Sequence, residues 1–248
     1  MSVPGDPDAA RGVVVVEDHR LLAQAVAMSL AAQEVPCEVL DLAGAADLDA
    51  LRRDLEARPP AVLWLDLDLA GLGDGGRLVA PLTAAGWVVV VVTGEPDEAR
   101  WGRALLAGAR GVLPKSTPLP VMLSALEAAR SGGDVTTAGE RDRLVALALR
   151  AAAEEEARLA PLRALSPREA EVLRLLGEGV PAAGIADRAV VSETTVRAQI
   201  RAVLRKLGVS SQLQAVAVAR RAGWTGPVPV PAVERRRGRV SGAASSPS

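Results

Sequence analysis

Short, unbroken apolar runs alternate with amphipathic segments along the first half of the chain. An apolar run with no polar interruption is typical of a strand buried on both faces of a parallel sheet. The segments between the runs repeat apolar residues at three- and four-residue spacing, which predicts helices with one buried face. The predicted strands are Val13–Val16, Glu38–Leu42, Ala61–Leu65, Trp87–Val92 and Gly111–Leu113, and the predicted helices are Arg20–Glu34, Ala45–Ala57, Arg77–Ala85, Asp97–Ala107 and Pro118–Arg130. This alternation predicts an α/β domain with a doubly wound, five-stranded parallel sheet and right-handed crossovers.

The rest of the chain has a helical pattern. Residues Ala138–Leu159 are rich in Ala, Glu, Arg and Leu and predict a linker helix that ends at Pro161. Ser166 and Glu169 then have the spacing of a capping box. The four helices predicted from here on begin at Ser166, cover Pro181–Arg188, extend from Ser192 to Leu207, and cover Ser210–Ala222. A short helix, a tight turn and a longer helix make a helix-turn-helix, so the linker helix joins the sheet domain to an all-α four-helix domain.

These patterns divide the chain into five parts. We expect a disordered leader over 1–11, the α/β domain over 12–131, and a largely helical linker over 132–163. The helix-turn-helix domain follows over 164–224, and a tail rich in Pro, Arg and Ser, expected to be disordered, covers 225–248.

Charge separates the two halves. Residues 1–160 carry 15 Lys/Arg against 24 Asp/Glu, whereas residues 161–223 carry 10 against 5. The basic second half is suited to a phosphate backbone. One Cys and one His exclude an internal disulfide and a multi-cysteine metal site. No apolar run reaches the roughly 18 residues of a membrane span, so we expect a cytoplasmic protein without a membrane partner.

Polar residues follow four of the predicted strands. Glu17 and Asp18 follow the first, Asp66 the third, Thr93 the fourth and Lys115 the fifth. The carboxyl ends of parallel strands meet at one edge of a sheet, where open α/β folds hold their chemistry. Two or three carboxylates there suffice for Mg²⁺, and an ammonium with the metal offsets the charge of a transferred phosphoryl group. Asp66 is the best-placed nucleophile, and Thr93 can donate to a phosphoryl oxygen.

The motif order resembles that of a known family. Glu17-Asp18, Asp66, Thr93-Gly94 and Leu113-Pro114-Lys115-Ser116 follow the pattern of the receiver domain of bacterial two-component response regulators, which is flavodoxin-like. The stretch 164–223 resembles the LuxR-type helix-turn-helix through Leu165–Glu169, Ile185-Ala186, Val191–Arg197 and Leu204–Val209. Together they resemble a NarL/FixJ-type response regulator.

The resemblance implies a transcription factor, not an enzyme. Asp66 would accept a phosphoryl group from a sensor histidine kinase, and Thr93 and Lys115 would respond to it. Mg²⁺ would bind Glu17 or Asp18, Asp66 and the backbone carbonyl of Asp68. Phosphorylation would bias a homodimer towards binding double-stranded promoter DNA.

The long helix of the second domain has two distinct faces. Val196, Ile200, Val203 and Leu207 share one face and should be buried. The opposite face is suited to a major groove, and its candidate DNA-binding residues are Thr194, Thr195, Arg197, Ala198, Arg201 and Arg205. We assign Arg197 and Arg201 to base edges or nearby phosphates, and Thr195 and Lys206 to phosphates.

Two other interpretations remain open. Val112 stands where the family usually has a Tyr or Phe switch residue, which leaves room for an orphan regulator whose receiver works without phosphorylation. The order Asp66-Leu67-Asp68, Thr93, Lys115 also resembles haloacid-dehalogenase-type phosphatases, in which Asp68 would be the general acid. That family's Asp pair normally follows its first strand, however, and the DNA-binding half would be unexplained.

Overall fold

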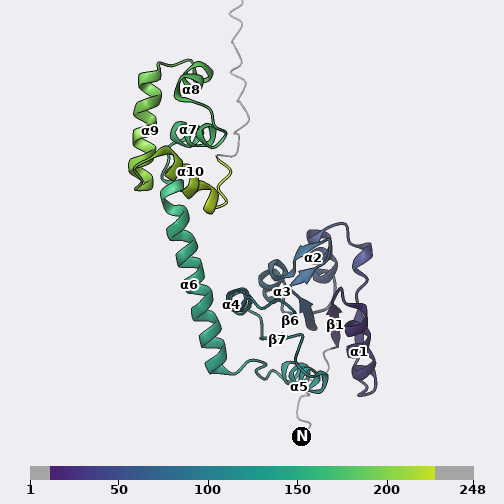
Figure 1. Cartoon of the computed structure of the whole chain (residues 1–248). Helices are drawn as coiled ribbons and strands as arrows, with labels where there is room; N and C mark the ends of the chain where they lie inside the picture. Colours follow the sequence, from purple (N-terminus) through teal and green to yellow (C-terminus); the bar gives the residue numbers. More distant parts are fainter. Residues whose placement is uncertain (1–11, 227–248) are drawn as a thin grey trace, which may run out of the picture. The chain divides into compact units, whose positions relative to one another are not determined.

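The computed structural model of the chain describes residues 12–226, which divide into two units between Glu154 and Glu155. The predicted leader and residues 227–248 of the predicted tail lie outside the described residues. Between residues 12 and 226, no helix combines the length and the apolar character needed to cross a membrane. Figure 1 labels the α-helices of each unit and the strands β1, β6 and β7.

Five parallel strands form the centre of the first unit. They are β1 (Val13–Val16), β2 (Cys37–Val39), β3 (Val62–Asp66), β6 (Val88–Thr93) and β7 (Gly111–Pro114). Their spatial order is β2-β1-β3-β6-β7, so β2 lies on one side of β1 and the later strands extend the sheet on the other side. The prediction of a doubly wound five-stranded parallel sheet is confirmed, with β3 at its centre.

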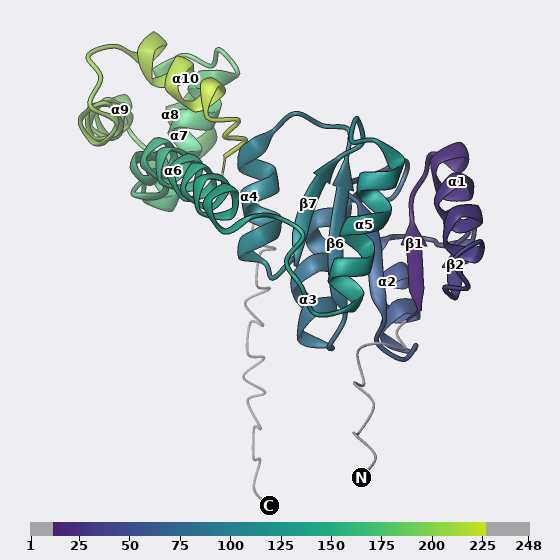
Figure 2. The same ribbon diagram turned by 90° about the horizontal axis from the view of Figure 1, so that it is seen from below.

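The two faces of this sheet carry separate apolar cores. The covering helices are α1 (Arg20–Ala31), α2 (Leu48–Glu56), α3 (Val79–Ala84), α4 (Glu98–Leu106) and α5 (Leu119–Arg130). Val13 and Val15 pack with α1 and α5, whereas Val14 and Val16 pack with α2 on the other face. Figure 2 shows α5 crossing one face of the sheet with α2 and α3 behind it. Successive strand side chains point to opposite faces, and therefore the all-apolar strands are buried on both sides.

Turn-forming carboxylates set several boundaries that the apolar pattern placed elsewhere. The predicted strand over 38–42 is too long, because Asp41 accepts a hydrogen bond from the Ala43 N–H and starts a 3-10 turn, η1 (Leu42–Gly44). Asp47 likewise caps α2, which begins at Leu48. The glycine-rich segment after β3 is more regular than a loop. It holds the antiparallel pair β4 (Asp68–Leu69) and β5 (Gly73–Asp74), and then the 3-10 helix η2 (Gly75–Leu78).

The long helix α6 (Ala138–Arg163) does not end at Pro161, and that prediction is wrong. A proline inside a helix costs about 3 kcal/mol through its missing N–H and its ring. Here the next residue, Leu162, is only 2% exposed and packs into the core of the second unit. Burying a leucine contributes about 1.5–3 kcal/mol, which is comparable with that cost and favours continuing the helix past the proline.

Within the first unit, the amino-terminal half of α6 packs closely against α4. Leu144 and Ala148 are buried there, and the Arg143 guanidinium forms a two-pronged ion pair with Glu98 at 2.7 and 2.8 Å. A Cβ atom at Gly102 would lie 2.0 Å from the Leu144 carbonyl oxygen and 2.8 Å from the Ala148 Cβ. The close approach of the two helices therefore requires glycine at position 102.

Replacing Gly102 with Ala is expected to loosen this contact. Two backbones must separate to admit the methyl group, so we expect the free energy of unfolding to fall by about 1–3 kcal/mol, partly offset by the better helix propensity of Ala. Denaturant unfolding and amide hydrogen exchange over residues 141–151 measure the change. Gly139→Ala is the matched control, since a Cβ there meets nothing within 4 Å. A Gly102→Ala protein as stable as the control would contradict the prediction.

The second unit is built from the part of α6 that follows Glu154 and from four further helices. They are α7 (Pro167–Gly177), α8 (Ala182–Ala189), α9 (Glu193–Leu207) and α10 (Gln212–Arg221). The predicted capping box is complete: the Ser166 hydroxyl accepts from the Glu169 N–H, and the Glu169 carboxylate accepts from the Ser166 N–H. Ser192 caps α9 through the Thr195 N–H. The predicted helix-turn-helix is thus confirmed as α8 and α9.

Candidate functional site

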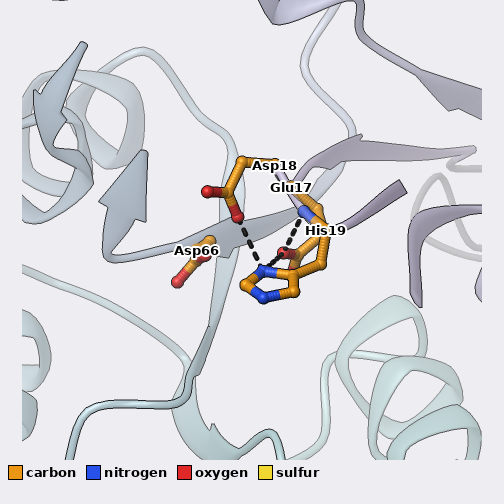
Figure 3. A group of neighbouring side chains, drawn as sticks. All are labelled: Glu17, Asp18, His19 and Asp66. Atoms are coloured by element: carbon orange, nitrogen blue, oxygen red, sulfur yellow. Dashed lines mark hydrogen bonds and ion pairs between the residues drawn. The ribbon is translucent and has the colours of Figure 1, made fainter. Parts of the chain in front are cut away.

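The polar residues that follow the strands do meet at one edge of the sheet. Register explains why: Val16 of β1 pairs with Leu65 of β3, and Thr93 of β6 pairs with Pro114 of β7. The residues just beyond these positions therefore project from the same edge. Figure 3 shows Glu17, Asp18 and His19, from the end of β1, beside Asp66 of β3.

Lys115 connects the two carboxylates at the centre of the site. Its Nζ lies 2.7 Å from Asp66 Oδ2 and 2.6 Å from Glu17 Oε1. Asp66 is 1% exposed and Glu17 is 4% exposed, so both acids are nearly removed from water. A buried carboxylate requires a partner of opposite charge or a metal, and one ammonium here serves two of them.

Burial and ion pairing shift the pKa values of Glu17 and Lys115 in opposite directions. Burial raises the pKa of Glu17, and the hydrogen bond from Lys115 does not fully offset it. Burial lowers the pKa of Lys115, but hydrogen bonds to Asp66 and Glu17 outweigh it, and the net pKa is raised. The lysine therefore remains an ammonium at neutral pH and holds a fixed positive charge beside Asp66.

The same cluster fits a hard divalent cation. Ligand atoms of Glu17, Asp18, His19 and Asp66 all lie within 4.8 Å of one another. Glu17 Oε2 is buried and has no hydrogen-bond partner among the described residues, which is the state of an oxygen with a coordination position to fill. Carboxylate oxygens are the ligands that Mg²⁺ prefers. Asp68 lies at the mouth of this cluster and is itself exposed.

The loops after β3 and β6 close around Asp66. The Asp68 N–H donates to Asp66 Oδ1 at 3.1 Å, and the Thr93 hydroxyl accepts from the Glu95 N–H at 3.1 Å. Gly75 passes so close that a Cβ there would lie 2.2 Å from the Asp66 carbonyl oxygen. These contacts hold the Asp66 carboxylate at the wall of a cavity of about 530 Å³, which Gly94 and Glu95 of the segment after β6 also line.

Two charged residues of this cavity were not predicted from the sequence. Arg100 of α4 and Glu95 line it together with Asp66, Asp68 and Lys115. Arg100 donates to the Leu67 carbonyl oxygen, to Asp74 and to Glu95. The one available signal is the position of Glu95 two residues after Thr93, which places it at the same edge of the sheet.

Val112, at the usual position of the switch aromatic, is 7% exposed and belongs to the core beneath α4. Its N–H donates to the buried Thr136 hydroxyl at 3.0 Å. Both the side chain and the backbone of this residue are therefore packed in place.

In the second unit, α9 has the two faces that its pattern predicts. Val196, Ile200, Val203 and Leu207 are buried. The predicted DNA-facing side chains are exposed: Thr194, Thr195, Arg197, Ala198, Arg201 and Arg205. Arg197 pairs with Glu193 one turn earlier at 2.6 Å. Lys206, for which a phosphate contact is predicted, donates to Glu169 at 2.6 Å and to the Ala164 carbonyl oxygen at 3.0 Å.

Comparison with known proteins agrees with both units. Residues 13–127 match the response regulator receiver domain, and residues 163–219 match the bacterial regulatory proteins of the luxR family. The nitrate/nitrite response regulator protein NarP of Escherichia coli (strain K12) is 32% identical over 207 residues, which cover 82% of this chain and 91% of NarP. The glycerol metabolism activator of Pseudomonas putida is 30% identical over 210 residues, covering 82% and 92%. A solved RcsB response regulator of Salmonella typhimurium has a TM-score of 0.43 and 25% identity, over 84% of this chain and 96% of that one. The chain belongs to the NarL/FixJ-type response regulators, with a receiver domain followed by a LuxR-type DNA-binding domain.

Proposed function

We propose that Asp66 accepts a phosphoryl group from a sensor histidine kinase and that this controls promoter binding by the second domain. The observation that carries the proposal is the contact of a nearly fully buried Asp66 with Lys115, beside the Glu17 and Asp18 carboxylates. A carboxylate that needs an ammonium and a cation close by is suited to phosphorylation, because these positive charges also offset the negative charge of the added phosphoryl group. A solvated surface acid needs neither.

In the proposed reaction, an Asp66 carboxylate oxygen attacks the phosphorus of a phosphohistidine. The new O–P bond forms as the P–N bond breaks, and the leaving imidazole nitrogen recovers a proton. Lys115, already 2.7 Å from Asp66, would pair with an equatorial phosphoryl oxygen, and the Thr93 hydroxyl would donate to another. Glu17 or Asp18, Asp66 and the Asp68 carbonyl would hold Mg²⁺, which supplies further charge neutralisation when bound.

The proposed output passes through α4. Thr93 gives up its hydrogen bond from the Glu95 N–H if its hydroxyl rotates towards a phosphoryl group, and the loop that leads into α4 then moves. A fixed Val112 favours this route over a rotating aromatic side chain. Phosphorylation would shift an equilibrium between arrangements that already exist. The favoured arrangement is a homodimer that binds double-stranded promoter DNA through α9.

Intact-mass spectrometry of the purified chain with acetyl phosphate and Mg²⁺ tests the proposal. We expect one adduct of about 80 Da, the mass of one phosphoryl group, together with stronger promoter binding. Promoter binding without any adduct would favour the orphan regulator. Continuous phosphate release from acetyl phosphate, with many turnovers per chain, would favour the phosphatase.

A further inference from the structure

Arg100 lies where three segments of the receiver meet. Its Nη2 donates to the Leu67 carbonyl oxygen at 2.6 Å and to Asp74 Oδ1 at 2.6 Å, and its Nη1 donates to the Glu95 carboxylate. Leu67 directly follows Asp66, and Glu95 is two residues beyond Thr93. One side chain on α4 therefore joins the segment that carries the proposed phosphoacceptor to the segment that carries the proposed switch hydroxyl.

The guanidinium is held firmly in this position. The Arg100 side chain is 17% exposed, whereas its partners Asp74 and Glu95 are about half exposed. The Leu67 carbonyl oxygen also accepts from the Gly75 N–H at 2.9 Å, so the backbone after Asp66 is held from two directions. Burial lowers the pKa of Arg100, but its hydrogen bonds to Asp74 and Glu95 outweigh burial and raise it. The side chain thus keeps its charge and its planar fork of donors.

Arg100 neutralises the negative charge of Glu95, which would otherwise oppose phosphorylation of Asp66. The Glu95 carboxylate lines the same cavity as Asp66, and an added phosphoryl group brings roughly −1.5 to −2 units of charge into that cavity. Without Arg100, Glu95 would be an unpaired like charge able to turn towards the incoming group. With Arg100 it is paired, and the loop from Thr93 to α4 is fixed with it.

We propose that Arg100 is a positioning residue for phosphoryl transfer, because it neutralises Glu95 and holds it away from the phosphoryl group. The inference rests on the proposed phosphorylation of Asp66. Arg100 does not contact Asp66 directly; it acts through Glu95, and its hydrogen bond to the Leu67 carbonyl oxygen holds the guanidinium in place.

The test compares rates of labelling by acetyl phosphate with Mg²⁺, followed by intact mass. Arg100→Ala should label about 10-fold more slowly than wild type, as expected for a displaced positioning group. The double variant Arg100→Ala/Glu95→Gln should recover most of the rate, because it removes the charge that Arg100 neutralises. Arg103→Ala is the matched control on the same helix: Arg103 is 52% exposed, pairs with Asp97 and does not line the cavity. Its rate should equal that of wild type.

The outcomes separate this inference from the proposed function. Absence of label on the wild-type chain would overturn both. A labelled wild type with an equally fast Arg100→Ala protein would overturn the role of Arg100 alone. A slow Arg100→Ala protein that Glu95→Gln does not restore would also overturn it, since that result indicates a purely structural defect.

Discussion

Replacing Asp66 with Asn is expected to abolish phosphoryl transfer to the receiver while leaving its fold intact. An amide oxygen is uncharged and cannot form a stable acyl phosphate, so the adduct of about 80 Da should be missing after incubation with acetyl phosphate and Mg²⁺. Asn has nearly the same shape and can still accept the Asp68 N–H that Asp66 accepts at 3.1 Å. Lys115 keeps Glu17 as a partner at 2.6 Å, so its ammonium is not left buried without a counter-charge.

Asp68→Asn is the matched control for this experiment. Asp68 is exposed, and the groups that it contributes to the proposed site are its backbone N–H and carbonyl. We therefore expect the Asp68 variant to form the same adduct, at a rate no lower than that of wild type. In a phosphatase of the haloacid-dehalogenase type, Asp68 would be the general acid and its loss would stop turnover. An adduct on the Asp66→Asn protein, at the wild-type rate, would place the phosphorylated residue elsewhere and contradict the proposal.

Local patterns predicted the sheet and its polar edge, for a physical reason. Strands such as Val13–Val16 and Val62–Asp66 are buried on both faces, so their apolar runs are unbroken and visible in the sequence. Parallel strands deliver their carboxyl ends to one edge, and the residues that follow them meet there regardless of helix positions. The convergence of Glu17, Asp66 and Lys115 therefore needed no knowledge of tertiary packing.

Contacts made by helices across the fold were not predictable in this way. Arg100 reaches Leu67 and Asp74, residues 33 and 26 positions away, and these contacts depend on where α4 packs. The same holds for Gly102, whose need for glycine arises only from the approach of α6. The prediction that the helix ends at Pro161 is wrong for the converse reason. Proline locally favours the end of a helix, but the tertiary burial of Leu162 outweighs that local preference.

Substitutions on α9 of the second domain are expected to have a comparably large effect on promoter affinity. The double variant Arg197→Ala/Arg201→Ala is expected to lower specific promoter affinity by at least about 100-fold without unfolding the protein. Both side chains are exposed on α9, and the residues that hold the helix in place, such as Val196 and Ile200, are on the opposite face. The Arg197–Glu193 pair is half exposed and therefore contributes little to stability. Gel-shift titration at fixed salt, with circular dichroism as a fold check, measures the two quantities.

Loss of net charge alone would also weaken binding, so the control must remove two positive charges from elsewhere. Arg168→Ala/Arg221→Ala does so at exposed positions of α7 and α10. Phosphate attraction is largely independent of sequence, whereas base contacts are not. If α9 reads the promoter, the α9 pair should lose discrimination between promoter and random DNA, and the control pair should keep it. Equal losses in the two double variants would mean that Arg197 and Arg201 act only as charges, and the assignment of α9 as the reading helix would fail.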